Sequence, residues 1–435
     1  MKRVKQERIE DLSNIKVEGD FKSAFQMMDE GTESLFVTGK AGTGKSTLLR
    51  YFRAKTDKNI VVVAPTGIAA VNVEGQTIHS FFVFPPRIIQ KEEVKYLNKD
   101  KLFEKIDALV IDEVSMVRAD MMDAIDQSLK INTGEMNTPF GGKQVIFIGD
   151  LYQLPPVVEK EAKEVLEINY KTPYFFSANV FNDIKIKMFE MKTVYRQKDA
   201  GFIDLLNKIR ENKCSAADMD KINARIIGAK ASKMEGIITL TTVNRVASEI
   251  NLGKLEKLPD SEHEYEADIY GEFDEKTFPT DKILKLKEQA QVMLLKNDPL
   301  KRWFNGTIGY VSYLDEDCVK VEVDGSVYEV KKEKWDKIRY TYDKKGDKIV
   351  SEIIGSFEQY PLKLAWAITI HKSQGQTFDN VIIDMERGAF THGQTYVALS
   401  RCRSLDGIFL RQAITGRDII FDRSIYEIEN IFSRV

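Results

Sequence analysis

The sequence predicts an α/β protein with two parallel-sheet cores, the second of which is interrupted by a β-rich insert. Three observations lead to this fold class. The chain has 435 residues, more than one hydrophobic core usually serves, so two or more domains are expected. Apolar, β-branched runs alternate with helical runs in two regions, which is typical of parallel sheets covered on both faces. Short alternating strands divide the second region, as in a small β-barrel.

The first core is expected between residues 33 and 150. Its strands and helices alternate in the order ESLFVTG (33–39), KSTLLRYFRA (45–54), NIVVVAPT (59–66), GIAAVNV (67–73), KIDALVIDE (105–113), MMDAIDQSLK (121–130) and KQVIFIGD (143–150). The alternation breaks between Gln76 and Leu102, where a Pro-Pro pair follows aromatic residues and precedes a charged segment. We interpret that stretch as a small excursion from the sheet.

The second core is expected from about Met191 onward. It begins with GFIDLLNKIREN (201–212), IITLTT (237–242) and NRVASEINLGKLEKL (244–258). The acidic stretch SEHEYEADIYGEFDEKTF (261–278) then indicates a loop or insertion. The strands expected in the insert are QVMLLKND (291–298), TIGYVSYL (307–314), CVKVEV (318–323), SVYEVKK (326–332) and KIVSEIIGSF (348–357). The parallel pattern returns in LAWAITIHKSQ (364–374), NVIIDME (380–386), GQTYVALSRCRS (393–404) and GIFLRQ (407–412).

The composition indicates a soluble globular protein without membrane segments. No apolar run approaches the roughly 20 residues that cross a bilayer, and the charged start MKRVKQERIEDL lacks the apolar core of a secretion signal. Three distant cysteines match no zinc spacing or disulfide framework, which predicts a reducing interior and no structural metal. The formal net charge of −3 gives no globally basic surface, so any nucleic-acid binding must depend on local groove chemistry.

The stretch FVTGKAGTGKSTLL (36–49) contains the full P-loop pattern between a strand and a helix. Glycines let the loop wrap a phosphate and point its N–H groups inward, while the next helix presents its positive end. We expect Lys45 to reach the β and γ phosphates and Ser46 to bind Mg²⁺. The alternative is a chance glycine turn, which the flanking strand and helix disfavour. The predicted nucleotide-binding residues are Gly39, Ala41, Gly42, Thr43, Gly44, Lys45, Ser46 and Thr47.

Paired carboxylates follow the strand LVIDEVSM (109–116), 67 positions after the P-loop lysine. Ligands of such sheets lie beyond the carboxyl ends of the strands, so both side chains should emerge beside the phosphates. Asp112 would hold Mg²⁺ through water, and Glu113 would orient and deprotonate the attacking water. The alternative, two acids that merely end a strand, is disfavoured because phosphoryl transfer needs both roles at this place.

Three further polar residues are candidates for sensing the γ-phosphate. Gln153 follows the strand KQVIFIGD in the loop LYQLPPV, although a single glutamine on a loop is usually solvated. Arg196 lies in TVYRQ and Arg401 in QTYVALSRCRS, both in the second core. Most arginines only solubilise a surface, but two from a facing domain would suit the charge that develops on the γ-phosphate.

The ordered motifs resemble those of the PIF-type (petite integration frequency) DNA helicases of superfamily 1B, which are related to RecD and to the phage helicase Dda. The resemblance spans roughly residues 20 to 412. It is carried by GKAGTGKS, APTGIAA, GQTIHSFF, VIDEVSM, PFGGKQVIFIGDLYQLPPV, VYRQ, AITIHKSQGQT and YVALSRCRS.

By this resemblance the two cores are RecA-like P-loop domains that hold ATP between them. Residues 1–76 and 102–184 would form domain 1A, and residues 77–101 the small wedge domain 1B. Residues 185–255 and 355–435 would form domain 2A, and residues 256–354 the SH3-like β insert 2B.

The resemblance also implies roles for individual residues. Arg196 and Arg401 match γ-phosphate sensors, and Gln153 matches the glutamine that couples ATP to DNA. The implied DNA contacts are Thr66, Gly67, His79, His371, Ser373 and Gln374, since hydroxyls, amides and helix-start N–H groups hold phosphates without reading bases. Phe81, beside Phe82, is a further candidate by stacking on bases, but burial of paired aromatics in the core is the favoured alternative.

One position departs from the family. The adenine-reading glutamine usually lies a little over twenty positions before the P-loop lysine, and that register falls on Lys22. Gln26, one helical turn later, is the substitute candidate.

The resulting hypothesis is an ATP- and Mg²⁺-dependent 5′-to-3′ DNA helicase that moves on single-stranded DNA and unwinds forked or structured duplexes. The alternatives are an ATP-gated DNA translocase or remodelling protein without strand separation, and a metabolic kinase or signalling GTPase indifferent to DNA. A cytoplasmic, nucleoid-associated bacterial or phage protein that works as a monomer is expected.

Overall fold

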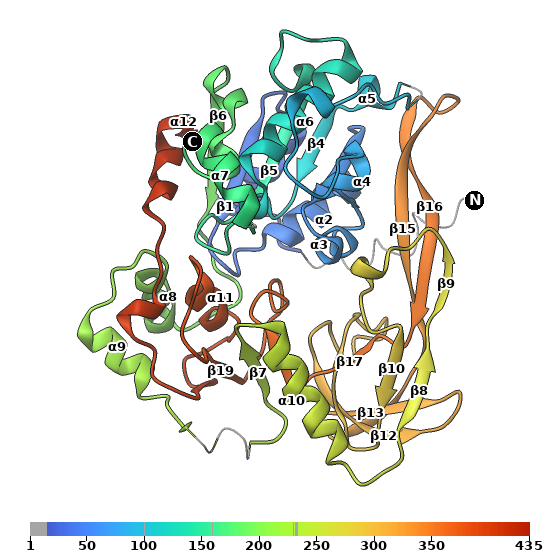
Figure 1. Cartoon of the computed structure of the whole chain (residues 1–435), viewed down its shortest axis with the longest axis vertical. Helices are drawn as coiled ribbons and strands as arrows, with labels where there is room; N and C mark the ends of the chain where they lie inside the picture. Colours follow the sequence, from blue (N-terminus) through green and yellow to red (C-terminus); the bar gives the residue numbers. More distant parts are fainter. Residues whose placement is uncertain (1–14, 100, 159, 229, 231–233) are drawn as a thin grey trace.

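The computed structural model describes residues 15–99, 101–158, 160–228, 230 and 234–435. Figure 1 shows two parallel-sheet cores one above the other, with a β-rich insert beside them and a long arm that rises from the insert to the upper core. The predicted class, an α/β protein with two such cores, is confirmed. Among the described residues, every helix is too short or too polar to cross a bilayer.

The first core contains a seven-stranded parallel sheet with the order β21-β6-β1-β5-β4-β2-β3. Its strands are β1 (Leu35–Gly39), β2 (Ile60–Ala64), β3 (Gln76–Thr77), β4 (Ala108–Ile111), β5 (Gln144–Gly149), β6 (Ile186–Met191) and β21 (Phe432–Arg434). Its helices are α1 (Gly19–Asp29), α2 (Lys45–Lys55), α3 (Gly67–Asn72), α4 (Ile78–Phe82), α5 (Leu102–Lys105), α6 (Ala119–Thr133), α7 (Lys160–Asn169) and α12 (Ile428–Ile431).

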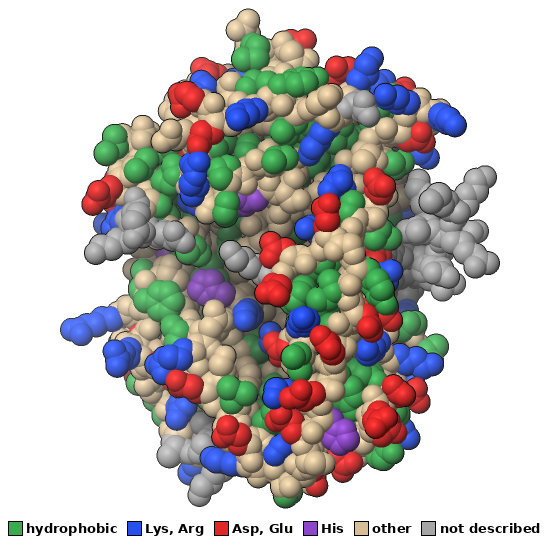
Figure 2. Space-filling view, turned by 45° about the vertical axis from the view of Figure 1, so that its right-hand side comes forward, with side chains coloured by type: hydrophobic (Ala, Val, Ile, Leu, Met, Phe, Trp, Pro, Cys, Tyr) green, Lys and Arg blue, Asp and Glu red, His purple; other side chains and the backbone are tan. Residues whose placement is uncertain are grey.

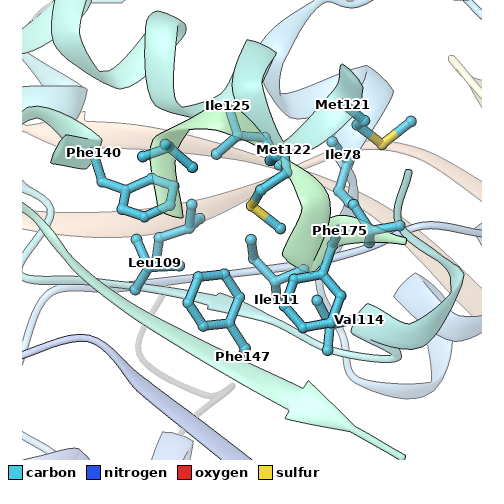
Figure 3. Close-up of a cluster of buried hydrophobic side chains, with 14 of the residues drawn as sticks. Ile78, Leu109, Ile111, Val114, Met121, Met122, Ile125, Phe140, Phe147 and Phe175 are labelled. Atoms are coloured by element: carbon cyan, nitrogen blue, oxygen red, sulfur yellow. The ribbon is translucent and has the colours of Figure 1, made fainter. Parts of the chain in front are cut away.

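Both faces of this sheet are buried because its strands are apolar at nearly every position. Successive side chains of a strand point to opposite faces, so in β4 Ala108 and Val110 face one cluster while Leu109 and Ile111 face the other. Figure 3 shows Leu109, Ile111 and Phe147 of the sheet packed against Met122 and Ile125 of α6. The two layers of helices fix the carboxyl ends of the strands, where the P-loop and the paired carboxylates follow.

The second core has a four-stranded parallel sheet with the order β18-β7-β19-β20. Its strands are β7 (Ile238–Thr241), β18 (Ala367–Thr369), β19 (Val381–Asp384) and β20 (Ile408–Leu410). Its helices are α8 (Ala200–Arg210), α9 (Ala216–Asn223), α10 (Asn244–Glu256) and α11 (Gln394–Leu399).

The insert between α10 and β18 has two parts. The compact part contains a five-stranded antiparallel sheet of β11 (Gln291–Leu294), β12 (Ile308–Leu314), β13 (Val319–Val323), β14 (Ser326–Val330) and β17 (Leu362–Leu364), and beside it the pair β8 (His263–Glu266) and β10 (Ile283–Leu286). The second part, which we call the arm, consists of β15 (Glu333–Asp343) and β16 (Lys348–Gln359), extended at its base by β9 (Asp268–Gly271).

The arm contacts the first core through its upper half. Tyr340 is buried there; its hydroxyl accepts a hydrogen bond from the Val62 N–H (3.3 Å), and its own N–H donates to Gln76 Oε1 (3.1 Å). The Ile349 N–H donates to Asn59 Oδ1 (3.1 Å). The arm therefore joins the insert to the first core by buried polar and aromatic contacts.

Three expected boundaries are wrong. Strand β6 was expected in the second core, but it pairs with β1 in the first sheet, and β21 near the end of the chain pairs with β6 there. The segment KIVSEIIGSF was expected in the barrel, but it forms β16 of the arm. The errors for β6 and β21 concern pairing between distant segments, which the alternation of residues within one strand does not specify, whereas β16 pairs with its neighbour β15 but is longer than a barrel strand.

Candidate active site

A cleft of about 820 Å³ lies between the two cores. The first core lines it with Ala41, Gly42, Gly44, Lys45, Ser46, Thr47, Arg50, Glu113 and Gln153. The segment after β6 and the second core line it with Tyr195, Arg196, Lys198, Asp199, Gly375, Thr377, Arg401, Arg403 and Ser404. The cleft thus brings together the P-loop, one acidic residue of the pair, Gln153 and both predicted arginines.

The P-loop connects β1 to α2 in a conformation that requires small residues. Gly42 and Gly44 have φ angles of 82° and 87°, and a Cβ at Gly42 would lie 2.5 Å from the Cβ of Arg196. The Lys45 ammonium group donates to the carbonyls of Gly39 (2.5 Å) and Lys40 (3.1 Å). Burial lowers the pKa of Lys45, while the carboxylates of Asp150 and Glu113 oppose that shift. The P-loop therefore surrounds one cation, the ammonium group of Lys45.

Two predicted P-loop residues, Gly39 and Thr43, do not line the cleft. Thr43 is fully buried, and its hydroxyl donates to the carbonyl of Lys40 (2.9 Å). Gly39 ends β1 next to it, with Thr43 Oγ1 2.7 Å from the position of a Cβ. These two residues stabilise the shape of the loop from its buried side. They do not line the cleft, where the sequence predicted them to contact the nucleotide.

Asp112 and Glu113 follow β4 directly and face the P-loop lysine. Glu113 has a left-handed backbone conformation with φ of 49°, which is uncommon for a residue other than glycine and turns its side chain into the cleft. Burial, with the repulsion of Glu113, raises the pKa of Asp112 to about 7. Burial also raises the pKa of Glu113, although Lys45 and Arg401 oppose the shift. A cation bound beside these two carboxylates would therefore stabilise their ionised forms.

The donor set fits a magnesium ion bound together with a triphosphate. Asp112 supplies a buried carboxylate whose raised pKa indicates that a cation would stabilise its charged form, and Ser46 supplies a hydroxyl at the start of α2. Mg²⁺ prefers such oxygen ligands and keeps several waters when it binds phosphates. The predicted ligands Ser46 and Asp112 are therefore compatible with this ion.

The two predicted arginines both line the cleft, Arg196 from the segment after β6 and Arg401 from the residues after α11. Arg196 donates to the Ser400 carbonyl (3.2 Å) and to the Gly375 carbonyl (3.5 Å). Arg401 is buried, and its guanidinium donates to the Val397 carbonyl (2.9 Å) and to the Ser400 hydroxyl (3.0 Å). In the described part of the chain, their recorded partners are neutral oxygens rather than carboxylates.

The electrostatic consequence is a pair of cations beside the P-loop, Arg401 buried and Arg196 half-buried. Burial lowers the pKa of Arg401 to about 9, and the charge of Arg196 contributes to this shift. Burial also lowers the pKa of Arg196. Cations that are desolvated and close to each other favour a nearby anion. A polyphosphate in the cleft would supply the missing negative charge.

Gln26 is not part of this cleft. It is exposed on α1, as is Lys22, and neither residue lines the cleft walls. Sequence reasoning missed Tyr195 instead, a residue of the cleft wall that is 54% exposed and whose ring lies 3.7 Å from the position of a Cβ at Gly44. The sequence feature that could have indicated Tyr195 is its position directly before Arg196, a residue already predicted to face the phosphates.

The predicted DNA contacts of the first core lie away from the nucleotide cleft. The Thr66 hydroxyl caps α3 by accepting from the Ala69 N–H (3.3 Å), and His79 is half-buried on α4. Gly67 has no room for a side chain, because a Cβ there would lie 2.5 Å from the Thr277 methyl group. Thr277 belongs to a short 3-10 helix, Glu275–Thr277, of the insert. In this structure the insert covers one predicted DNA contact.

Two predicted DNA contacts are wrong for the side chains concerned. The Phe81 ring is fully buried against Phe82 (4.8 Å between centroids) and Phe103 (5.4 Å), so it belongs to the core, as the favoured alternative had it. Ser373 is fully buried, and its hydroxyl donates to the Ile370 carbonyl (2.7 Å). It holds the turn that presents its neighbours His371 and Gln374, both half-buried.

The molecular surface carries no single basic region on the side shown in Figure 2. Lys and Arg side chains alternate there with Asp and Glu, and the surface is hollowed between the upper and lower parts of the molecule. This mixture agrees with the formal net charge of −3. A polyanion would have to be held by specific contacts in the hollow rather than by the general field.

The sequence matches known helicase families. The model of the PIF1-like helicase family matches residues 19–220, and that of the UvrD-like helicase C-terminal domain matches residues 364–405. ATP-dependent DNA helicase Pif1 of Bdellovibrio bacteriovorus is 32% identical over 89% of this chain and 86% of its own length. The chain spans only 58% of the length of the Xenopus laevis helicase PIF1, to which it is 34% identical over 86% of this chain.

Solved structures agree over nearly the whole chain. Pif1 from Bacteroides sp in complex with ADP-AlF4 has 38% identity and a TM-score of 0.88, covering 96% of this chain and 97% of its own. Bacteroides Pif1 bound to ssDNA, with 39% identity and the same coverage, has a TM-score of 0.69. By TM-score, the overall arrangement is therefore more similar to the DNA-free structure than to the ssDNA-bound one. The resemblance seen in the motifs is confirmed, and the chain belongs to the PIF1-like helicase family.

Proposed function

We propose that this protein is an ATP-dependent DNA helicase that moves along single-stranded DNA in the 5′-to-3′ direction implied by its family. One observation carries the proposal. Arg196 and Arg401 lie in the cleft opposite the P-loop, with only neutral oxygens as recorded partners among the described residues. Such a cleft is complete only when a triphosphate lies between the cores. ATP binding would therefore draw the cores together, and hydrolysis would release them.

The roles of the residues follow from their positions. Lys45 would leave the loop carbonyls and bind the β and γ phosphates, while Arg401 and Arg196 stabilise charge that develops on the γ-phosphate. Glu113 would orient the attacking water and accept its proton. When bound by Ser46 and Asp112, Mg²⁺ would neutralise charge on the phosphate oxygens. Tyr195 offers an aromatic ring on which adenine could stack, in place of Gln26.

Single-stranded DNA is the proposed track. Thr66 would hold phosphates on the first core, with His79 nearby, and Gly67 would do so once the insert that covers it here moves away; His371 and Gln374 would hold phosphates on the second core. Because each set belongs to a different core, closing and opening the cleft would move one set relative to the other along the strand. Residues 77–101, the proposed wedge, would separate the duplex ahead of the motor.

The test is the ATPase rate with and without oligo-dT, followed by strand displacement on duplexes with a 5′ or a 3′ tail. We expect oligo-dT to raise the ATPase rate at least tenfold and the 5′-tailed duplex to be unwound faster. An ATPase rate indifferent to oligo-dT would reject the motor, and faster unwinding of the 3′-tailed duplex would reject the direction. Unwinding that survives deletion of residues 77–101 would reject the wedge.

A further inference from the structure

The loop that carries Gln153 leaves the first core but is held by the second. Leu154 is fully buried in the second core's cluster, together with Phe202 of α8. Nε2 of His392 lies 3.1 Å from the carbonyl of Leu151. Gly393 has a φ of 71°, and a Cβ there would lie 2.5 Å from the carbonyl oxygen of Gln153. Movement of the second core must therefore act on this loop.

Within the loop, one carboxylate links Gln153 to the second core. Asp150 Oδ2 accepts a hydrogen bond from the Gln153 side-chain amide (3.2 Å). Asp150 Oδ1 accepts from the Tyr152 N–H (3.2 Å) and from Nη2 of Arg210, the last residue of α8 (3.1 Å). The chain of contacts Arg210–Asp150–Gln153 therefore runs from a helix of the second core to a side chain that lines the nucleotide cleft.

The Arg210–Asp150 ion pair is deeply buried, with side-chain exposures of 6% and 0%. The Arg210 guanidinium carbon also lies 3.7 Å above the centre of the Tyr152 ring, and its Nε–H has no hydrogen-bond partner among the described residues. A buried ion pair recovers little more than its desolvation cost, so it is a poor source of stability. The ion pair instead fixes the position of Asp150 relative to α8, because a buried carboxylate and a buried guanidinium are stable only when they stay in contact.

Helix α11 of the second core also contacts the P-loop. The Ala41 N–H donates to the hydroxyl of Tyr396 (2.9 Å), a buried residue of α11, which packs against α8. The second core thus contacts two segments that line the nucleotide cleft, the P-loop and the loop that carries Gln153, and both contacts are buried behind the cleft wall.

We propose that Arg210 is a positioning residue for ATP hydrolysis, which through Asp150 fixes Gln153 in the cleft when the second core closes on the first. Arg210 does not line the cleft itself, so it acts on the reaction only through Gln153. The inference rests on the proposed role of Gln153 at the γ-phosphate.

The test is a double-mutant cycle of Arg210→Gln and Gln153→Ala in the full chain, measured as DNA-stimulated ATPase. Each single variant is expected to lower kcat at least tenfold while KM for ATP changes less than threefold. The double variant should be no more than about twofold slower than Gln153→Ala, because both changes remove the same contact chain. Arg210→Lys, which keeps the charge beside Asp150, should recover part of kcat.

Other outcomes separate the two proposals. If Gln153→Ala leaves kcat unchanged, the role of Gln153 fails and that of Arg210 fails with it. Suppose that Gln153→Ala lowers kcat. If Arg210→Gln then has no effect, or lowers kcat by the same factor in the Gln153→Ala background as in the original chain, only the role of Arg210 fails. Should Arg210→Gln not fold, as judged by thermal melting, Arg210→Lys enters the same cycle with an expected loss of about threefold that vanishes in the Gln153→Ala background.

The matched control is Arg411→Gln, which breaks an arginine–aspartate pair that lies entirely within the second core. Arg411 Nη1 lies 2.7 Å from Asp384 Oδ2, and its side chain is half exposed, away from the nucleotide cleft. This variant is expected to leave kcat within twofold of the original chain in both backgrounds. An equal loss of kcat in Arg411→Gln and Arg210→Gln would overturn the proposal.

Discussion

Glu113 combines a left-handed backbone conformation with a carboxylate that faces Lys45 and Arg401. Glu113→Gln keeps the size of the side chain but removes its ability to accept a proton from water. We therefore expect kcat for ATP to fall by about 100-fold or more, whereas ATP binding persists. Steady-state ATPase and equilibrium binding of a fluorescent ATP analogue check this. A kcat close to that of the original chain would remove Glu113 as the base.

Phe81 belongs to the core, so its truncation should act on stability. Phe81→Ala removes a fully buried ring that packs on Phe82, Phe103 and Tyr340. The free energy of unfolding is expected to fall by about 3–5 kcal/mol in denaturant titration. Tyr96→Ala, at a ring that is 65% exposed in the same region, serves as the control and should change it by less than about 0.5 kcal/mol. Equal effects would contradict the burial of Phe81.

His392 should make the stability of the protein depend on pH. Its Nδ1 accepts from the Asp422 N–H (3.0 Å), so Nε2 carries the proton and donates to the Leu151 carbonyl. Burial lowers the pKa of His392, although Asp422 and Asp150 oppose the shift. Below pH about 6.5 the unfolded chain binds a proton that the folded chain does not, so stability present above that pH is lost as the pH falls.

The measurement is denaturant unfolding between pH 7.5 and 5.5. The original chain should lose free energy of unfolding over this range, and His392→Gln should lose less of it. The half-buried imidazoles of His79 and His371, whose pKa values burial also lowers, would account for the remaining dependence. Identical pH profiles for the two proteins would show that His392 titrates alike in the folded and unfolded chain.

The residues that could be predicted are those whose chemistry depends on a local pattern. Lys45 and Ser46 follow from the P-loop spacing, and Asp112 with Glu113 from an apolar strand that ends in carboxylates. Arg210 carried no such signal, since it ends an amphipathic helix, and no local pattern indicated that it would pair with Asp150, which follows a strand 60 positions earlier. Their meeting depends on how two cores dock, which no local pattern encodes.

At the scale of elements, the arm should be held to the first core by its buried contacts rather than by its ion pair. Tyr340→Ala removes a buried ring and the acceptor for the Val62 N–H, and it should release the tip of the arm. We expect limited proteolysis between residues 343 and 348 to become at least several times faster. Lys105→Ala removes the exposed ion pair with Asp347 and the ammonium contact with the Tyr342 ring, both at the surface, and should leave the rate almost unchanged. The reverse order would contradict this account.

Element types were easier to predict than element partners. Strands such as β4 and β5 are continuous apolar runs, so their conformation follows from the residues themselves. β21 has three residues, Phe432–Arg434, and pairs with β6 more than 240 positions earlier in the chain. β15 and β16 alternate like barrel strands but are long enough to reach the first core. Length and long-range pairing, rather than residue type, decided these cases.

At the scale of the whole molecule, weak salt dependence of DNA binding is expected. The net charge of −3 gives no long-range attraction for DNA, and the proposed contacts are mostly neutral hydroxyl, amide and imidazole groups. A single strand gives a slope of about −0.7 per phosphate neutralised when log affinity is plotted against log salt. Fluorescence anisotropy with oligo-dT between 50 and 300 mM salt should give a slope shallower than about −3. A steeper slope would indicate a cationic groove that these residues do not form.

Strands β6 and β21 have a mechanical consequence. The chain leaves the first core after β6 and returns to it through α12 and β21, which pairs with β6, so both connections to the second core border the same edge of the sheet (Figure 1). Two backbone links along one edge allow the lower body to swing about that edge but resist sideways shear and free twisting. Opening of the nucleotide cleft would thereby follow one path, and the proposed DNA contacts of the two cores would separate by a repeatable step.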